Sequence, residues 1–322
     1  MPPIDPTVEV AGRRLTLRNL DKPFWPQDGL TKGDLLAYCA RVSPWLLPHL
    51  RNRPLVMTRY PDGIEGKSFY QKDVPEHAPA WIRLFPYWSR DSNRLIRFVV
   101  CDDTATLLWV VNTGAIELHP LLGQIPDPQV PDFAVIDLDP AEGVGYRETV
   151  DVAGMLHDLL DYLGLRGYPK TTGATGIHVF VPIEPRYDFR YTADFVRRLG
   201  VVLRGQAPER VTLERSVRRR RGRVYVDYLQ NALGKTLVSV FCPRPRPGAP
   251  VSFPVAWEDL RYVAPGDFTL RNAVDLLQRR GDAFLPVLRD RQRLEVPSQR
   301  LDRLLAAAGA QVPAAPSTSE GS

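Results

Sequence analysis

Phe133-Ala-Val-Ile-Asp-Leu-Asp-Pro140 is an apolar run interrupted only by two aspartates. Such a run is typical of a buried β-strand, on which side chains two residues apart point to the same face. Asp137 and Asp139 would therefore share one face, while Ile136 and Leu138 fill the core behind them. The stretch predicts a central strand that carries a pair of neighbouring carboxylates.

A third carboxylate, Asp227, follows in a second strand-like run, Arg223-Val-Tyr-Val-Asp-Tyr-Leu-Gln230. If this run pairs with the first, the three acids form one cluster. Like charges so close cannot all ionise unaided, and hard divalent ions with oxygen ligands neutralise them in phosphoryl-transfer sites. The Asp-x-Asp pattern alone is unspecific, because sugar-nucleotide transferases and phosphatases share it. At this point a metal site and a pair of strand-end loop carboxylates both remain open.

The composition indicates a globular protein with a mild basic excess. Of 322 residues, 44% are apolar, and 42 Lys and Arg face 37 Asp and Glu. Six arginines fall between Arg215 and Arg223, which suits nucleic acid or nucleotide phosphates. A solvated basic surface explains the bulk charge equally well. Widely spaced Cys39, Cys101 and Cys242 indicate reduced thiols. No signal peptide or membrane span is recognisable, so we expect a cytoplasmic, nucleoid-associated protein.

Periodicity and turn residues predict a mixed α/β fold, because helices and strands alternate irregularly. Thr31 is the expected N-cap of the first helix, and Gly164 is the expected end of the third. The predicted elements are a hairpin over Val8–Leu17, helices over Thr31–Pro48, Asp103–Thr113, Tyr146–Leu163 and Asp188–Arg204, and strands over Leu55–Tyr60, Ser68–Lys72, Leu95–Val100, Val224–Asp227 and Thr236–Phe241.

A Gly-rich turn, Thr171-Thr-Gly-Ala-Thr-Gly176, leads into an apolar strand that carries His178. The turn lacks the Gly-Lys-Ser/Thr ending of a Walker A loop. Its small residues can still offer backbone N–H groups to a phosphate. By itself His178 is equally a candidate for a core histidine. Combined with the three acids and with Lys235 and Arg244, the turn predicts one phosphoryl-transfer site.

These three motifs resemble, in order, those of the archaeo-eukaryotic primase superfamily, and most of all the polymerase domain of bacterial ATP-dependent DNA ligase D. The resemblance covers residues from about 10 to about 300. It implies a primase-polymerase fold, with an RRM-like catalytic sheet flanked by helices and an N-terminal αβ module. The motifs that carry it are Asp137-Leu-Asp139-Pro, Thr172-Gly-x-x-Gly-x-His178 and Val226-Asp-Tyr-Leu-Gln-Asn231, supported by Arg53-Pro-Leu-Val-Met-Thr-Arg-Tyr-Pro-Asp-Gly, Ser68-Phe-Tyr-Gln-Lys, Glu117-Leu-His119-Pro and Pro254-Val-Ala-Trp-Glu-Asp-Leu260.

The resemblance also implies a domain division. Residues 10–305 would form one catalytic domain, between a flexible N-terminus (residues 1–9) and a Pro/Ala/Ser-rich disordered tail (residues 306–322). Within it, the N-terminal αβ module would cover about 10–130, the catalytic sheet about 131–260 and a helical part about 261–305.

The implied activity is template-dependent nucleotidyl transfer that extends 3′-hydroxyl ends and fills gaps at double-strand breaks, with NTPs preferred over dNTPs. Asp137 and Asp139 would hold two divalent ions, manganese or magnesium, and Asp227 would bind the ion that activates the primer hydroxyl. The implied partners are Ku, a DNA ligase and gapped DNA with a 5′-phosphate. The residues expected to bind the nucleotide are Thr172, His178, Arg220, Gln230, Lys235, Arg244 and His119.

A further element of the family reads the 5′-phosphate across the gap. Phe69, Tyr70 and Lys72 match its aromatic-aromatic-x-Lys pattern, and stacking rings with an ammonium suit an exposed base and a terminal phosphate. Ordinary strand packing is the alternative for the rings, and we expect one of them to be buried. Arg53 and Arg59 are both candidates to supplement Lys72.

Two positions depart from the family pattern. Thr172 stands where serine is common, which keeps the hydroxyl. Thr175 stands where lysine is often found, so one phosphate-binding charge is missing unless arginines from Arg218 to Arg221 replace it.

The sequence also lacks the Lys-x-Asp-Gly nucleophile motif of a ligase. We therefore expect no nick sealing, and either a free-standing polymerase or a fragment of a longer protein. Two alternatives remain: a de novo primase of a mobile element, and a catalytically quiet end-binding module that recruits Ku or ligase. The acid triad counts against the second, and no second nucleotide site supports the first.

Overall fold

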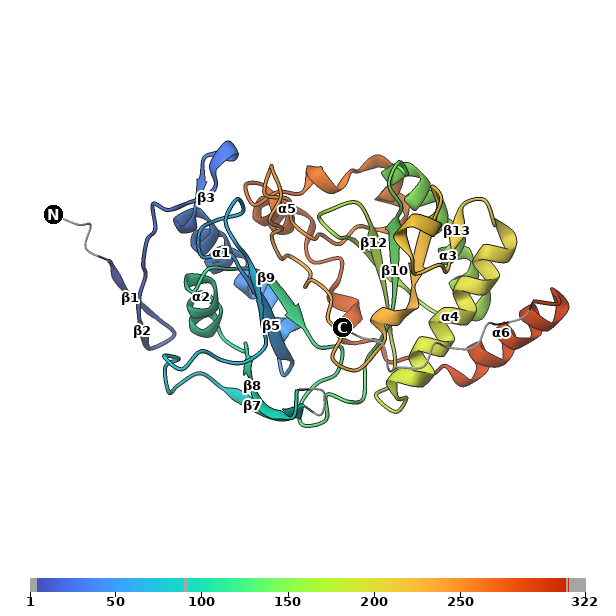
Figure 1. The fold of residues 1–322 in the computed structure, drawn as a ribbon, viewed down its shortest axis with the longest axis horizontal. Helices are drawn as coiled ribbons and strands as arrows, with labels where there is room; N and C mark the ends of the chain where they lie inside the picture. Colours follow the sequence, from blue (N-terminus) through green and yellow to red (C-terminus); the bar gives the residue numbers. More distant parts are fainter. Residues whose placement is uncertain (1–4, 90–91, 311, 313–322) are drawn as a thin grey trace. The chain divides into compact units, whose positions relative to one another are not determined.

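The computed structural model describes residues 5–89, 92–310 and 312. Its architecture is mixed α/β, as predicted (Figure 1). The elements group into two compact units, and each unit is assembled from separate stretches of the chain. Unit 1 consists of Met1–Pro128, Lys170–Ala174 and Gly234–Arg289, and unit 2 consists of Gln129–Pro169, Thr175–Leu233 and Asp290–Ser322.

Unit 1 is built on a sheet with strand order β6-β5-β8-β7, in which β9 also pairs with β5. Helix α1 packs against α2, and α2 packs against β9. The side chain of Thr31 and that of Asp34 form a capping box at the start of α1, which is why the helix begins there. The strands and helices of unit 1 are β1 (Thr7–Val10), β2 (Arg13–Thr16), β3 (Pro23–Trp25), β4 (Leu30–Thr31), α1 (Lys32–Leu50), β5 (Pro54–Arg59), β6 (Phe69–Gln71), β7 (Leu84–Ser89), β8 (Arg94–Val100), α2 (Thr104–Asn112), β9 (Ala115–Pro120) and α5 (Ala273–Arg280).

Unit 2 is built on a sheet with strand order β11-β12-β10-β14-β13. Strand β10 is central, and β12 and β14 pair with it in antiparallel fashion on its two sides. Helices α3 and α4 both contact β10, and α6 packs on the two helices (Figure 1). The elements are β10 (Phe133–Pro140), α3 (Tyr146–Leu163), β12 (Ile177–Pro182), α4 (Phe189–Gln206), β13 (Val211–Thr212), β14 (Val224–Asp227) and α6 (Glu295–Ala307). Strand β11 (Tyr168–Thr171) begins in unit 2, and its last two residues are assigned to unit 1.

Alternation along β10 separates core from surface. Ile136 and Leu138 are fully buried, whereas the side chains of Asp137 and Asp139 are 14% and 46% exposed. From Ile136 to Asp139 the strand therefore buries its two apolar residues and keeps the two carboxylates accessible, as the sequence predicts.

The predicted helices all form, with bounds that differ by two residues or fewer. Helix α3 ends at Gly164, which adopts φ 77°, and the hairpin of β1 and β2 turns through Ala11 and Gly12 at φ 50° and 73°. Six strands were not predicted, namely β3, β4, β7, β9, β11 and β13.

The predicted strand over Thr236–Phe241 was wrong. Its backbone groups bond to separate partners instead of one neighbouring strand: the Ser239 N–H donates to Leu118 O, and Val238 O accepts from Lys170 Nζ. Of the predicted flexible ends, residues 1–4, 311 and 313–322 lie outside the described residues, while β1 begins at Thr7 and α6 ends at Ala307. Across residues 5–89, 92–310 and 312, no helix has the length and apolarity needed to cross a membrane.

Candidate active site

Strand pairing gathers three carboxylates and a histidine on one face of the sheet of unit 2. Asp137 lies directly opposite Asp227 of β14 and directly opposite His178 of β12. Side chains directly opposite each other in an antiparallel pair point to the same face, and Asp139 shares that face because it lies two residues from Asp137. The sheet thus brings together the three acids that the sequence singled out.

Each acid has its own polar neighbour. Asp137 Oδ1 lies 3.5 Å from His178 Nε2, and Asp139 Oδ2 accepts a hydrogen bond of 2.6 Å from Arg220 Nη1. Asp227 accepts three hydrogen bonds, from the Tyr225 hydroxyl (3.1 Å), the Leu229 N–H (2.9 Å) and Gln230 Nε2 (3.1 Å).

Arg220 is held in place by an aromatic ring as well as by Asp139. Its guanidinium lies 4.1 Å from the ring centroid of Tyr225, within the range of a cation–π contact. Its side chain is only 10% exposed, and Nε finds no hydrogen-bond partner among the described residues. Of the six arginines between Arg215 and Arg223, this one therefore belongs to the acid cluster.

Tyr225 contacts both Asp227 and Arg220, and Arg220 is the neighbour of Asp139. The sequence analysis did not single out Tyr225. Burial first, and the nearby Asp227 carboxylate second, raise the pKa of Tyr225 well above its ordinary value. The hydroxyl therefore remains protonated and donates to Asp227. Its spacing, two residues before Asp227 on a strand, was the signal that could have identified it.

The donor set suits hard divalent cations, because all three acids offer oxygen ligands on one face. As the side chains stand, no group of three or more Asp, Glu, His or Cys in the described part of the chain is arranged to hold a metal ion. In this arrangement Arg220 supplies the positive charge next to Asp139. If ions bind, Asp137, Asp139 and Asp227 are the residues that would hold them.

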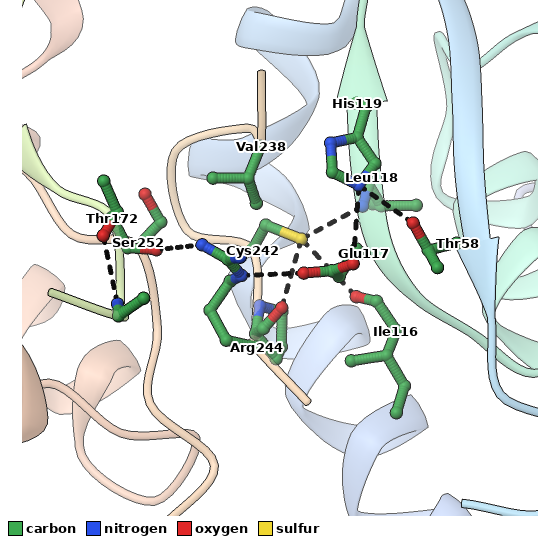
Figure 2. A network of polar contacts seen from close by, with 12 residues as sticks. Thr58, Ile116, Glu117, Leu118, His119, Thr172, Val238, Cys242, Arg244 and Ser252 are labelled. Atoms are coloured by element: carbon green, nitrogen blue, oxygen red, sulfur yellow. Dashed lines mark hydrogen bonds and ion pairs between the residues drawn. The ribbon is translucent and has the colours of Figure 1, made fainter. Parts of the chain in front are cut away.

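A second polar network lies within unit 1 and is centred on Arg244 (Figure 2). Arg244 Nε donates to Glu117 Oε1 at 2.8 Å, and Nη1 donates to Thr172 O. Glu117 Oε2 lies 3.6 Å from His119 Nε2, which in turn lies 3.1 Å from the Thr58 hydroxyl. Two of the residues expected to bind the nucleotide, Arg244 and His119, are thereby connected through one carboxylate, and Thr172 is joined to Arg244 through its backbone carbonyl.

Glu117 stands in a motif that the sequence analysis quoted, but no role in the site was predicted for it. Burial alone would raise the pKa of Glu117, but the hydrogen bonds and charges of His119 and Arg244 outweigh burial and hold it at about 2. The carboxylate is therefore ionised at neutral pH, and it can orient the side chains of both Arg244 and His119. Its place two residues before His119 on one strand was the available signal.

The depressed pKa predicts that Glu117 stabilises the fold in a pH-dependent way. Its pKa is about 2 in the folded chain, against 4.5 ordinarily. The stabilisation is therefore complete above the unfolded value and disappears as pH falls through the folded value. We expect Glu117→Gln to lower the free energy of unfolding by about 2–3 kcal/mol at pH 7, and by progressively less towards pH 3. Urea titrations over this range measure the difference.

The matched control is Glu76→Gln, which changes an exposed glutamate of the same unit. A pH-independent loss in the Glu117 variant would contradict the assigned cause.

Both aromatic side chains of β6, Phe69 and Tyr70, are exposed, so the expectation of one buried ring was wrong. Phe69 is 45% and Tyr70 52% exposed, because β6 is an edge strand whose one neighbour among the described strands is β5. Arg59 lies 5.1 Å from the Phe69 ring centroid, and the Tyr70 ring lies 5.6 Å from that of His119. The Tyr70 hydroxyl also bonds to that of Thr236.

The basic candidates near β6 differ in accessibility. Lys72 is exposed, and Arg59 is half-buried with bonds to Thr113 O and Gln71 Oε1. Arg53 is 2% exposed and donates to Leu121 O and Leu122 O. This geometry favours Arg59 over Arg53 as a supplement to Lys72.

The remaining predicted residues lie at the surface. Lys235 and Thr175 are exposed, and no basic side chain stands at position 175 itself.

Comparison with known proteins identifies relatives along most of the chain. The family model of the LigD primase-polymerase domain matches residues 31–284. The bifunctional non-homologous end joining protein LigD of Bacillus subtilis is 33% identical over 281 residues, which are 87% of this chain and 45% of that protein. The multifunctional LigD of Pseudomonas aeruginosa is 34% identical over 236 residues, 73% of this chain and 28% of that protein. The chain thus spans less than half the length of these curated relatives.

A solved structure shows the same fold. The polymerase domain from Mycobacterium tuberculosis ligase D, in complex with DNA, aligns with a TM-score of 0.80 and 28% identity. The alignment covers 87% of this chain and 99% of that domain.

Proposed function

The chain belongs to the LigD primase-polymerase domain family, and from this premise we propose that it is a template-dependent polymerase of DNA end joining. It extends 3′-hydroxyl ends and fills gaps at double-strand breaks. The observation that carries the proposal is the register that sets Asp137 opposite Asp227, with Asp139 on the same face. Three accessible carboxylates in this arrangement suit the binding of divalent ions in nucleotidyl transfer.

In this proposal Asp137 and Asp139 hold two divalent ions, manganese or magnesium, and Asp227 serves the ion on the primer side. When bound, such ions lower the pKa of the attacking hydroxyl and stabilise charge on the attacked phosphorus. Tyr225 and Gln230 hold the Asp227 carboxylate in position through their hydrogen bonds. His178 lies next to Asp137, where it can donate to a phosphate oxygen.

The incoming nucleotide, an NTP in preference to a dNTP, is bound by residues that the family motifs single out. These are the Thr172 hydroxyl, the Arg244 guanidinium, Lys235 and His119, and Glu117 orients two of these groups. The family motifs likewise assign His178, Arg220 and Gln230 to nucleotide binding. Guanidinium and ammonium groups neutralise the triphosphate, and a 2′-hydroxyl is the group by which a site distinguishes the two sugars.

The proposed substrate is a DNA end or gap with a downstream 5′-phosphate, and the proposed partners are Ku and a DNA ligase. Two findings support this: the relatives are named as non-homologous end joining proteins, and the similar polymerase domain was solved with DNA. Exposed Phe69 and Tyr70 offer stacking surfaces for a base.

The exposed ammonium of Lys72 is proposed to bind the 5′-phosphate. We expect Lys72→Ala to slow gap filling about tenfold on a 5′-phosphorylated gap, because a charge-assisted bond is lost. Rates on gaps with a 5′-phosphate and with a 5′-hydroxyl, measured side by side, test this. The native chain should prefer the phosphorylated gap, and the variant should not.

Lys67→Ala provides the control, since Lys67 is an exposed lysine just before the aromatic pair. An equal loss on both gaps would show that Lys72 does not read the phosphate.

The proposed function is tested by extension of a gapped, 5′-phosphorylated duplex with Mn²⁺ and each NTP or dNTP. Template-dependent addition at the 3′-hydroxyl is the expected result. Synthesis on a template without any primer would favour the primase alternative instead. Binding of DNA ends with no incorporation of any nucleotide would favour an end-binding module and overturn the polymerase proposal.

A further inference from the structure

Lys170 is a fully buried lysine at the base of the Gly-rich turn, 0% exposed. Its ammonium donates to Val238 O at 3.0 Å and to the Ser252 hydroxyl at 2.7 Å, and all three residues belong to unit 1. Burial of an ammonium costs several kcal/mol of desolvation, so such a group is a weak source of stability even when it is well bonded. Its hydrogen bond to Ser252 instead connects it to the Gly-rich turn.

The Ser252 hydroxyl is hydrogen-bonded to both Lys170 and the turn. It donates to Thr171 O at 2.8 Å, while the Thr171 N–H donates to Phe253 O at 2.8 Å. The next carbonyl along the chain, Thr172 O, accepts from Arg244 Nη1. Two consecutive carbonyls of the turn are thus fastened by basic side chains, one through Ser252 and one directly.

The turn has little room to shift between these attachments. Gly173 adopts φ 68°, and a Cβ added there would lie 2.7 Å from Arg244 Cγ and 3.0 Å from the backbone nitrogen of Ser252. The Thr172 hydroxyl accepts from the Ala174 N–H at 3.1 Å. These contacts therefore hold the backbone of Thr172 in one conformation.

We infer that Lys170 is a positioning residue of the nucleotide-binding turn, and that it acts through Ser252 and Val238 without touching the nucleotide. The inference rests on the proposed function, because Thr172 must contact the triphosphate for its position to matter. A turn that is already ordered binds its ligand without paying the entropy of ordering. Loss of Lys170 should therefore weaken nucleotide binding far more than it slows chemistry.

The chain offers a matched control in Lys32, the other lysine that is buried among the described residues of unit 1. Lys32 is 4% exposed and likewise donates to a backbone oxygen, Arg18 O, at 2.7 Å. It lies at the start of α1. No hydrogen bond among the described residues joins its side chain to the Gly-rich turn. Lys32→Met removes a comparable buried ammonium and controls for a general loss of stability.

The experiment compares native chain, Lys170→Met, Ser252→Ala and Lys32→Met. For each, the KM for NTP and the kcat are measured on a gapped duplex with Mn²⁺, together with urea unfolding. We expect Lys170→Met to raise KM about tenfold and to change kcat less than about threefold. Ser252→Ala should raise KM by a smaller factor, because the ammonium keeps its bond to Val238 O. Lys32→Met should leave KM unchanged.

A native KM in Lys170→Met, or an equal rise in Lys170→Met and Lys32→Met, would overturn the inference. If Lys170→Met does not fold, Ser252→Ala decides: a raised KM supports the inference, and an unchanged KM overturns it. Native chain that neither binds NTP nor extends a primer would instead overturn the proposed function, so the two failures are distinguishable.

Discussion

Replacing Asp137 and Asp139 together with alanine is expected to abolish nucleotide addition, with a loss of at least about a thousandfold. Both carboxylates lie on the accessible face of β10, where they can hold divalent ions. The measurement is single-nucleotide extension of a gapped duplex over a range of Mn²⁺ concentrations. A loss caused by missing ligands should persist at every concentration.

Two further variants separate catalysis from folding. Alanine at Asp139 leaves the buried Arg220 without its carboxylate, which destabilises the chain. Asp137→Asn with Asp139→Asn keeps the shape of both side chains and should be equally inactive. Asp151→Ala with Asp158→Ala removes two exposed carboxylates of α3 in the same unit and should retain activity. Near-native activity of the asparagine pair would show that these acids are not the catalytic centre.

Gly173→Ala is expected to disrupt the proposed nucleotide-binding turn and to raise the KM for NTP by at least about tenfold. The left-handed backbone costs alanine about 1–2 kcal/mol. In addition, the new Cβ would meet Arg244 Cγ at 2.7 Å and the Val251 carbonyl carbon at 3.0 Å. Relief of this contact displaces Arg244, which the turn and Glu117 hold between them. Steady-state kinetics and urea unfolding together measure both effects.

The control is Gly248→Ala, at φ 81° with no atom within 4 Å of the new Cβ. It should cost stability by the backbone effect alone and leave KM unchanged. An equal KM for the two variants would mean that the packing around Gly173 does not matter to nucleotide binding.

The sequence was a good guide wherever structure depends on near neighbours. Strand alternation placed Asp137 and Asp139 on one face, and a capping residue and a terminal glycine bounded α1 and α3. The mixed α/β class followed from the same patterns. The pairing of β10 with β14 was expected from the need to gather the third acid, and the register confirms it.

Features that depend on distant partners were not predictable in this way. Glu117 resembles any strand glutamate until Arg244, 127 residues later, is seen to bond to it. Tyr225 resembles a core tyrosine until Arg220 stacks on it. The exposure of both aromatic rings on β6 follows from its position at a sheet edge, which sequence alternation does not reveal.

The discontinuous make-up of unit 1 has a consequence for its synthesis on the ribosome. Trp25 Nε1 donates to Arg244 O across 219 positions, and the Tyr38 hydroxyl donates to Phe241 O across 203. These buried partners of the first strands and of α1 do not exist until most of the chain has been translated. Part of the apolar surface of the N-terminal segment therefore stays exposed while the intervening stretches of unit 2 are synthesised. Contacts so distant in sequence slow folding, so unit 1 is completed only after its last segment, Gly234–Arg289, has been synthesised.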